Sequence, residues 1–356
     1  MNDRDKVLVY LSRLEISNKK MENILEKVKD FSFSSIFKDN NFVEILSKDE
    51  YHRFLTEFDA TEFENSLLNM QNAGIKILTI FSSEYPKNLI NLPDRPVVLY
   101  AKGDLSLLDK PCIAVVGTRS PSSYGKVITE KLVGEIASAG FVVVSGLCYG
   151  VDEIAHRKTL EVGGKTIAVV GSGFNNIYPS TNTALSKEIE KYGLLLSEYT
   201  PSFVAKRYTF PLRNRIVAGL SKGVLITEAA LKSGTVHTKE YALEYGKDVF
   251  AVPGNINNPK SELPNHLIKT AQAECVTCGD DVIEFYGMKK VAAKNKAINL
   301  SFDEKTILDL LANGEKDFEY LVQKSQIPVG ILNSCLTTLE IRGLIRRLPA
   351  GIFAAL

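Results

Sequence analysis

Short apolar runs alternate with amphipathic segments through the middle of the chain. The apolar runs, bounded by glycine or polar residues, predict strands at 113–116, 141–144, 166–170, 194–196, 223–227 and 248–252. Helical patterns follow most of them, at 123–139, 151–162, 182–192, 210–221 and 233–246. Fully apolar strands separated by helices are typical of a parallel sheet with helices on both faces. The pattern therefore predicts an α/β fold with a Rossmann-like parallel sheet core.

The two ends of the chain have different patterns. Apolar residues in 1–72 follow helical spacing, as do Met21, Ile24, Leu25 and Val28 in MENILEKVKDF. From residue 299 onward, three helical stretches and a two-stranded wing follow in the order of a winged helix, with the third helix at 328–341. The predicted domains are 1–72, helical (SAM-like); 73–286, Rossmann-like; 287–298, a Lys/Ala-rich linker; and 299–356, a winged helix.

Composition places the chain among ordinary globular proteins. Of its 356 residues, 45% are hydrophobic and 24% charged, which excludes a largely disordered chain. No apolar run approaches the ~20 residues that cross a bilayer, and the N-terminus lacks the form of a signal peptide, so we expect no membrane partner. Five cysteines are too few for a disulfide scaffold and favour a cytoplasmic protein.

The overall charge is balanced, but its distribution is not. The 43 basic and 42 acidic residues give a net charge of +1, and this balance argues against a nucleic-acid partner if the charge is evenly spread. Residues 1–70, however, hold 10 basic and 14 acidic side chains, whereas Thr200–Lys222 holds five basic residues and no acid. The cations are thus concentrated in the middle of the chain.

The first candidate ligand site follows the first predicted strand of the α/β core, because ligands of such folds bind at the carboxyl ends of the strands. There, Gly117 ends the strand, Thr118 offers a hydroxyl and Arg119 is the only charge in the turn. The N–H groups of the next helix also favour an anion. The alternative is a structural turn with a solvated arginine. Since G-x-G-x-x-G is absent, a nicotinamide site is not favoured.

A second candidate is the segment AKRYTFPLRNRIVAGLSKG. It places Lys206, Arg207 and Arg213 among aromatic residues that include Phe210. Rings on which bases stack, set among cations that neutralise phosphates, are what single-stranded nucleic acid requires. The alternative is a solvated basic face, or arginines paired with buried acids.

A third candidate is the helix start Ser233, Gly234 and Thr235, whose small residues and free amides could seat a phosphate. Upstream of it, Glu228 closes a strand and is the strongest enzymatic feature of the chain.

Asp152 and His156 lie four residues apart and could form a general base with its orienting partner. Because no nucleophile accompanies them, we favour an aspartate at a helix N-terminus bonded to a structural histidine.

Metal and cofactor motifs are weak. Cys275 and Cys278 form one C-x-x-C without a second pair, and no P-loop or H-E-x-x-H occurs. We therefore expect no metal site and no cofactor.

Seven segments in register resemble the DNA-processing protein A family (DprA, also called Smf). They are GIKILTIFSSEYPKNLINLPDRPVVLYAKGD, AVVGTR…YG, VSGLCYGVDEIAH, TIAVVGSGFNNIYP, SEYTP…FPLRNRIVAGLS, EAALKSGT and FAVPG. With the winged helix, the resemblance spans residues 74 to 356. It implies a cytoplasmic protein without a cofactor that binds incoming single-stranded DNA in natural transformation, protects it and helps load the RecA recombinase. It also implies a homodimer formed through the Rossmann-like domain.

The resemblance also carries site residues over. The G-S-R turn of the family corresponds to Gly117, Thr118 and Arg119, and the S-G-[ST] helix start to Ser233, Gly234 and Thr235. The basic and aromatic positions before R-N-R correspond to Lys206 and Phe210.

Three features depart from the family pattern. His237 lies inside the helix that follows the S-G-[ST] motif, and Leu263–Pro264 stands in a loop that is glycine-containing in the family. The region 1–70 lacks the glycine hairpin of a helix-hairpin-helix.

The winged helix itself carries little positive charge. Residues 299–356 hold six basic and seven acidic groups, and Glu340 is the only charge in the third helix. A recognition helix ordinarily brings several cations into the groove, so we expect a partner-binding or regulatory surface. Arg342, Arg346 and Arg347 are its only candidate phosphate contacts.

Two other functions compete with DNA binding. The first is a Rossmann-type nucleotide-handling enzyme, such as a nucleoside-monophosphate phosphoribohydrolase that would use Glu228 and a phosphate held at Ser233–Thr235. The P-G-G-x-G-T-x-x-E run of such enzymes is missing here. The second is a transcription regulator led by the winged helix, which its nearly uncharged third helix disfavours.

Overall fold

The computed structural model describes residues 1–28, 36, 41–288, 300–312, 314–348 and 351–355. The chain forms two compact units, Met1–Val291 and Ala292–Leu356. Most of the predicted linker at 287–298 lies outside the described residues. The finer division of the first unit into a helical and a Rossmann-like domain stays a prediction.

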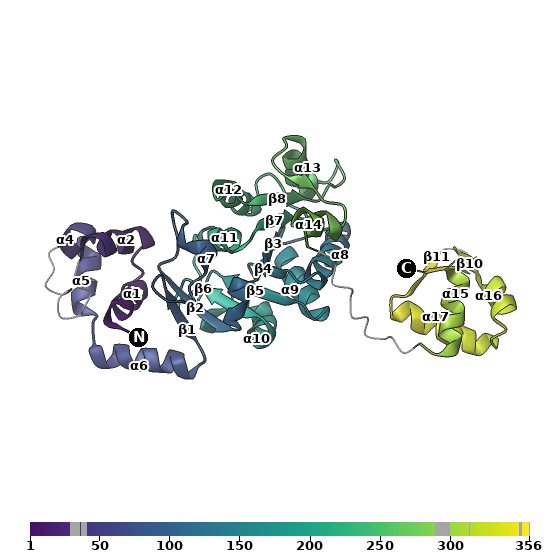
Figure 1. Cartoon of the computed structure of the whole chain (residues 1–356), viewed down its shortest axis with the longest axis horizontal. Coiled ribbons are helices and arrows are strands. Elements are labelled where there is room, and N and C mark those ends of the chain that lie inside the picture. The colour runs from purple at the N-terminus through teal and green to yellow at the C-terminus, as the bar shows by residue number, and fades with distance from the viewer. Residues whose placement is uncertain (29–35, 37–40, 289–299, 313, 349–350, 356) are drawn as a thin grey trace. The chain divides into compact units, whose positions relative to one another are not determined.

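A nine-stranded sheet forms the centre of the first unit, in the order β1-β2-β6-β5-β4-β3-β7-β8-β9 (Figure 1). Its strands are β1 Lys76–Thr79, β2 Val98–Gly103, β3 Cys112–Val116, β4 Val142–Ser145, β5 Lys165–Val170, β6 Leu194–Ser197, β7 Gly223–Ile226, β8 Asp248–Ala251 and β9 Glu274–Cys275. The six strands predicted for the core appear as β3 to β8. From β6 to β9 all pairs are parallel.

The sheet is mostly rather than wholly parallel. β2 pairs antiparallel with both β1 and β6, whereas the predicted core, β3 to β8, is wholly parallel. The short helix α7, Lys87–Ile90, lies in the connection from β1 to β2.

Helices cover both faces of the parallel part of the sheet and complete three layers (Figure 1). One face packs against α7, α11 and α12, and the other against α8, α9 and α14. These helices follow apolar strands, so each strand's two faces are both buried. Their bounds, with those of the neighbouring helices, are α8 Ser123–Ser138, α9 Val151–Glu161, α10 Thr183–Tyr192, α11 Thr209–Leu220, α12 Thr235–Glu244, α13 Glu262–Lys269 and α14 Gly279–Phe285.

The N-terminal helices build a core of their own at the β1–β2 edge. They are α1 Asp3–Arg13, α2 Asn18–Lys27, α4 Asn41–Ile45, α5 Lys48–Thr56 and α6 Ala60–Asn72. Met21 and Ile24, part of the predicted apolar face, are buried in this core together with Val98 and Tyr100 of β2. The helices therefore pack on the same strand that joins the parallel sheet through β6.

The second unit is a winged helix. Helices α15 Phe302–Leu311, α16 Phe318–Ser325 and α17 Val329–Ile341 are followed by the wing strands β11 Ile345–Leu348 and β12 Ile352–Ala355. Both predicted wing strands are present. The short strand β10, Lys316–Asp317, also pairs with β12, so the sheet has three strands. None of the helices within the described part of the chain combines the length and the hydropathy that a bilayer span requires.

Candidate nucleic-acid site

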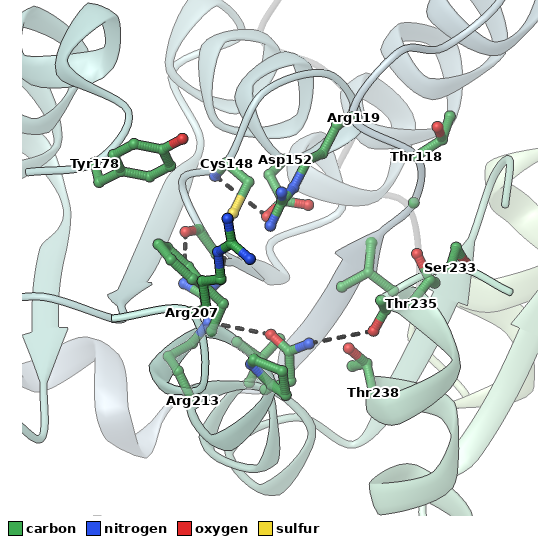
Figure 2. Close-up of a pocket in the computed structure, with 18 residues that line it drawn as sticks. Thr118, Arg119, Cys148, Asp152, Tyr178, Arg207, Arg213, Ser233, Thr235 and Thr238 are labelled. Carbon is green, nitrogen blue, oxygen red and sulfur yellow. Dashed lines mark hydrogen bonds between the residues drawn. The ribbon is translucent and has the colours of Figure 1, made fainter. Parts of the chain in front are cut away.

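A pocket of 620 Å³ opens at the carboxyl edge of the parallel sheet, where the loops after β3, β4, β5, β6 and β7 converge (Figure 2). This is the edge at which α/β folds bind ligands. The lining residues are Val116, Gly117, Thr118, Arg119, Gly146, Cys148, Asp152, Tyr178, Arg207, Phe210, Pro211, Arg213, Asn214, Val217, Ser233, Gly234, Thr235 and Thr238.

Nine of the ten predicted site residues line this one pocket, although they come from three separate segments of the chain. They are Gly117, Thr118, Arg119, Arg207, Phe210, Arg213, Ser233, Gly234 and Thr235. The fold thus brings the predicted residues together. That they bind nucleic acid stays a prediction.

Backbone contacts fix the turn after β3. The Thr118 amide donates to the carbonyl of Glu228 at 2.6 Å, and the Thr118 carbonyl accepts from the Val151 amide at 3.2 Å. A Cβ on Gly117 would lie 2.6 Å from a Val151 methyl, so the close approach requires glycine. The turn is held by its backbone, which leaves the exposed Arg119 side chain free to reach a ligand.

The aromatic side of the pocket is built around Phe210, in the first turn of α11. Its ring centroid lies 5.4 Å from that of Tyr178 and 5.7 Å from the Arg119 guanidinium carbon. Arg207, three residues earlier, is exposed. Two rings and two accessible guanidinium groups on one pocket can hold a base and its phosphates together.

Arg213 has a different environment from Arg119 and Arg207. Its side chain is 2% exposed and donates to the carbonyls of Gly146, at 2.5 Å, and Val169. Another donor of the same guanidinium lies 3.6 Å from the sulfur of Cys148. Arg213 therefore joins the loop after β4 to the end of β5. Most of its N–H donors are already used in these contacts.

The N-terminus of α12 forms the opposite side of the pocket (Figure 2). Gly234 is its N-cap residue, and no side chain caps the helix. The Ser233 hydroxyl oxygen is buried and has no hydrogen-bond partner among the described residues. Uncapped amides at a helix start carry partial positive charge, so this side suits a phosphate oxygen.

Asp152 and His156 play a structural role, as favoured, but they are not bonded to each other as expected. The Asp152 carboxylate accepts from the Cys148 amide at 3.3 Å. His156 Nδ1 lies 2.7 Å from the Thr166 hydroxyl, which donates to the carbonyl of Val143. The single hydroxyl proton is thus used, and Nδ1 must carry the hydrogen that links His156 to Thr166.

Burial shifts the pKa values of this pair in opposite directions. It raises the pKa of the Asp152 carboxyl, an effect that the Arg213 guanidinium partly offsets. It lowers the pKa of His156 to about 3, and Arg213 adds to this shift. A neutral, wholly buried histidine cannot reach a substrate, so the general-base interpretation is not supported.

Lys206, the tenth predicted residue, lies away from the pocket. Its ammonium group pairs with Glu15, in the segment between α1 and α2, at 2.7 Å. Because Glu15 lies almost two hundred residues before Lys206, no local pattern in the sequence indicates this partner. Arg119 and Arg207 are thus the accessible predicted cations that line the pocket, and a DNA contact by Lys206 stays a prediction.

Glu228 is also away from the pocket lining. Its buried carboxylate accepts from the Ser122 amide at 2.8 Å, the Ser122 hydroxyl at 2.6 Å and the Asn258 amide at 3.1 Å. These bonds tie the start of α8 to the end of β7. They give Glu228 a structural role and remove the main support for a phosphoribohydrolase.

Metal ligation finds no support in the described part of the chain. Within it, no three His, Cys, Asp or Glu side chains gather closely enough to hold an ion. Cys275 is exposed, and Cys278 is the N-cap residue of α14.

Three polar or aromatic lining residues escaped the sequence analysis: Tyr178, Asn214 and Thr238. Tyr178 is the next-to-last residue of TIAVVGSGFNNIYP, one of the segments that carry the family resemblance. The amide of Asn214 donates to the carbonyl of Gly234 at 3.5 Å and so joins α11 to the start of α12. The R-N-R spacing placed Asn214 between two arginines, and that position was the available signal.

The fold and the site define a class: a three-layer Rossmann-like protein with a cationic, aromatic-lined pocket at the strand ends and a C-terminal winged helix. The chain belongs to the DNA recombination-mediator protein A family, whose model matches residues 76–287. A model described as the DprA winged helix domain matches residues 291–351.

Curated relatives and solved structures agree with this family. The protein Smf of Escherichia coli is 35% identical over 316 residues, which cover 86% of this chain and 84% of that protein. The DNA processing protein DprA of Streptococcus pneumoniae is 44% identical over 62% of this chain and 78% of its own length.

Two solved structures share the fold. The structure of the S. pneumoniae protein superposes with a TM-score of 0.70 and 33% identity, covering 80% of this chain and 98% of that one. A structure of DNA processing protein A from Helicobacter pylori, titled for its single-stranded DNA binding mode, has a TM-score of 0.55 and 37% identity. It covers 60% of this chain and 95% of its own.

Proposed function

We propose that this chain binds single-stranded DNA in the pocket at the carboxyl edge of its sheet. One observation carries the proposal: accessible Arg119 and Arg207 lie on the same pocket as Phe210 and the uncapped start of α12. Single strands present both charged phosphates and uncovered base faces. A site for them needs cations and rings within one nucleotide of each other.

The two halves of the pocket suit different parts of a nucleotide. Arg119 and the amides at Gly234 and Thr235 would hold phosphate oxygens. Phe210, with Tyr178 tilted against it, would offer a face to the base. A duplex hides its base faces, so it would gain only the phosphate contacts.

The relatives supply the biological setting of the proposal. Proteins named for DNA processing share this fold, and the H. pylori structure is titled for single-stranded DNA binding. We infer that the chain acts in the cytoplasm during natural transformation, where it protects incoming single strands and helps load the RecA recombinase. Its action is binding, without catalysis or cofactor, and it forms a homodimer through the Rossmann-like domain.

Binding of fluorescent oligo-dT tests the site. Arg119→Ala should lower the affinity about tenfold, because a hydrogen bond to a charged group contributes about 1.5 kcal/mol. Arg157→Ala is the matched control: this arginine of α9 is also accessible, pairs with Glu153 and does not line the pocket. Equal binding by the Arg119 variant and the wild type would show that the pocket is not the site.

Two further measurements test the inferred partners. Light scattering of the full chain should give the mass of a dimer, and a monomer at all concentrations would exclude the homodimer. In a RecA filament assay on single strands, wild-type protein should shorten the lag and the Arg119 variant should not. An unchanged lag with the wild type would remove RecA loading from the proposal.

A further inference from the structure

Three exposed tyrosines follow three neighbouring strands at the carboxyl edge of the sheet. Tyr149 follows β4, Tyr178 follows β5 and Tyr208 follows β6; their exposed fractions are 42%, 51% and 53%. The strand order β6-β5-β4-β3 places their loops in a row that leads to the Arg119 turn after β3. Adjacent strands lie about 4.8 Å apart, so consecutive loops are within reach of consecutive nucleotides.

Two of these tyrosines border the pocket. Tyr178 lines it directly, as Figure 2 shows. Tyr149 stands between Cys148, which lines the pocket, and Gly150, which lies against the Arg119 turn. The closeness of that contact is clear from the position of a Cβ built on Gly150, only 2.6 Å from the carbonyl carbon of Arg119. Both loops therefore form the rim beside the accessible arginine.

The acidic surroundings of Tyr208 exclude it from the row of tyrosines that could contact DNA. This ring lines a second cavity, of 660 Å³, in which two cations, Lys19 and Arg215, are outnumbered by five carboxylates: Glu15, Glu22, Glu26, Asp94 and Glu198. The Lys206 ammonium group, 5.9 Å from the centre of the Tyr208 ring, is already paired with Glu15. Phosphates would be repelled there, so a bound strand is expected to stop short of Tyr208.

We propose that Tyr149 and Tyr178 are stacking residues for the bases that flank the nucleotide held in the pocket. The inference rests on the proposed function and extends it from one nucleotide to a track across the β4 and β5 loops. A strand anchored by its phosphate at Arg119 has its neighbouring bases over these loops. Stacking on tyrosine does not depend on base identity, so the track tolerates any sequence.

Alanine variants of the full chain test the track, with oligo-dT and an abasic oligonucleotide of equal length as ligands. Tyr149→Ala and Tyr178→Ala should each weaken oligo-dT binding about fivefold or more, the loss expected for one stacked base. Binding of the abasic strand should not change, since it has no base to stack. Tyr149→Phe and Tyr178→Phe should bind as the wild type does.

Tyr208→Ala is the matched control, because it removes an equally exposed ring outside the proposed track and should leave binding unchanged. If the tyrosine variants bind oligo-dT as the wild type does while Arg119→Ala weakens binding, the track is wrong and the proposed site stands. If Arg119→Ala also binds normally, the proposed function itself fails. Equal losses for oligo-dT and the abasic strand would assign the tyrosines a structural role and overturn the inference.

Discussion

Replacing Arg213 should unfold the site, whereas replacing Arg207, six residues earlier, should only weaken ligand binding. Both arginines line the pocket, but Arg213 is buried and Arg207 is exposed. Arg213→Leu would leave the carbonyls of Gly146 and Val169 without their donor. It would also leave the buried Asp152 without the positive charge that partly offsets the effect of burial on its pKa.

The size of the effect follows from these contacts. Removing one partner of a buried charged group costs about 3–5 kcal/mol, because the remaining polar groups stay buried and unpaired. For a unit of this size the melting temperature should fall by about 5–15 °C. Among the described residues Arg207 forms no hydrogen bond or ion pair, so Arg207→Leu should change stability by less than about 0.5 kcal/mol. It should lower the affinity for single strands about tenfold.

Circular dichroism is the appropriate assay, because the chain has no tryptophan to report unfolding by fluorescence. The melting curve of each variant is compared with its affinity for oligo-dT. The double variant Arg213→Leu/Asp152→Asn should recover part of the lost stability, since it also removes the stranded carboxylate. An unchanged melting temperature for Arg213→Leu, or an equal loss for Arg207→Leu, would refute the assignment of one arginine to the fold and the other to the ligand.

Two further predictions concern groups around the same pocket. Because the pKa of His156 falls to about 3 on folding, from 6.5 in the unfolded chain, its contribution to stability is complete above pH 6.5 and is lost as the pH falls toward 3. His156→Gln should therefore flatten the dependence of the unfolding free energy on pH in that window, and an unchanged slope would count against a buried neutral histidine. Gly150→Ala should abolish oligo-dT binding, since its φ is +76° and the new Cβ would lie 2.4 Å from the Thr118 carbonyl oxygen. Gly163→Ala, with φ +74° and no atom within 4 Å, should bind normally; equal behaviour of the two variants would contradict a steric cause.

The parallel core could be predicted because its signal is local. The apolar runs of β3 to β8 are bounded by glycine or polar residues, and a helical pattern follows most of them. The antiparallel β2 could not be oriented in the same way, because its direction depends on pairing with β6, almost a hundred residues later. Strand β10 has only two residues, Lys316 and Asp317, and no periodicity to detect.

Part of the pocket could be predicted from the rule that α/β folds bind ligands at the carboxyl ends of their strands. That rule led to the turn at Arg119, to α11 and to the start of α12. The sequence could not show that Lys206 lies outside the pocket lining, because adjacent residues in a loop need not face the same side and its partner Glu15 comes from a distant segment. Tyr178 could not be predicted as a lining residue from its own segment. It contacts Phe210 because β5 and β6, the strands before the two residues, are neighbours in the sheet.

The most direct test of the central claim compares the affinity for a single strand and for a duplex of equal length at about 50 mM and about 200 mM salt. The account predicts tighter binding of the single strand at both concentrations, because only the single strand offers base faces to Phe210 and Tyr178. It also predicts weaker binding at higher salt, with each neutralised phosphate contributing a slope of about −0.7 to the logarithmic plot and with Arg119→Ala reducing the slope by about that amount. Equal or tighter binding of the duplex, or a slope that Arg119→Ala leaves unchanged, would contradict it.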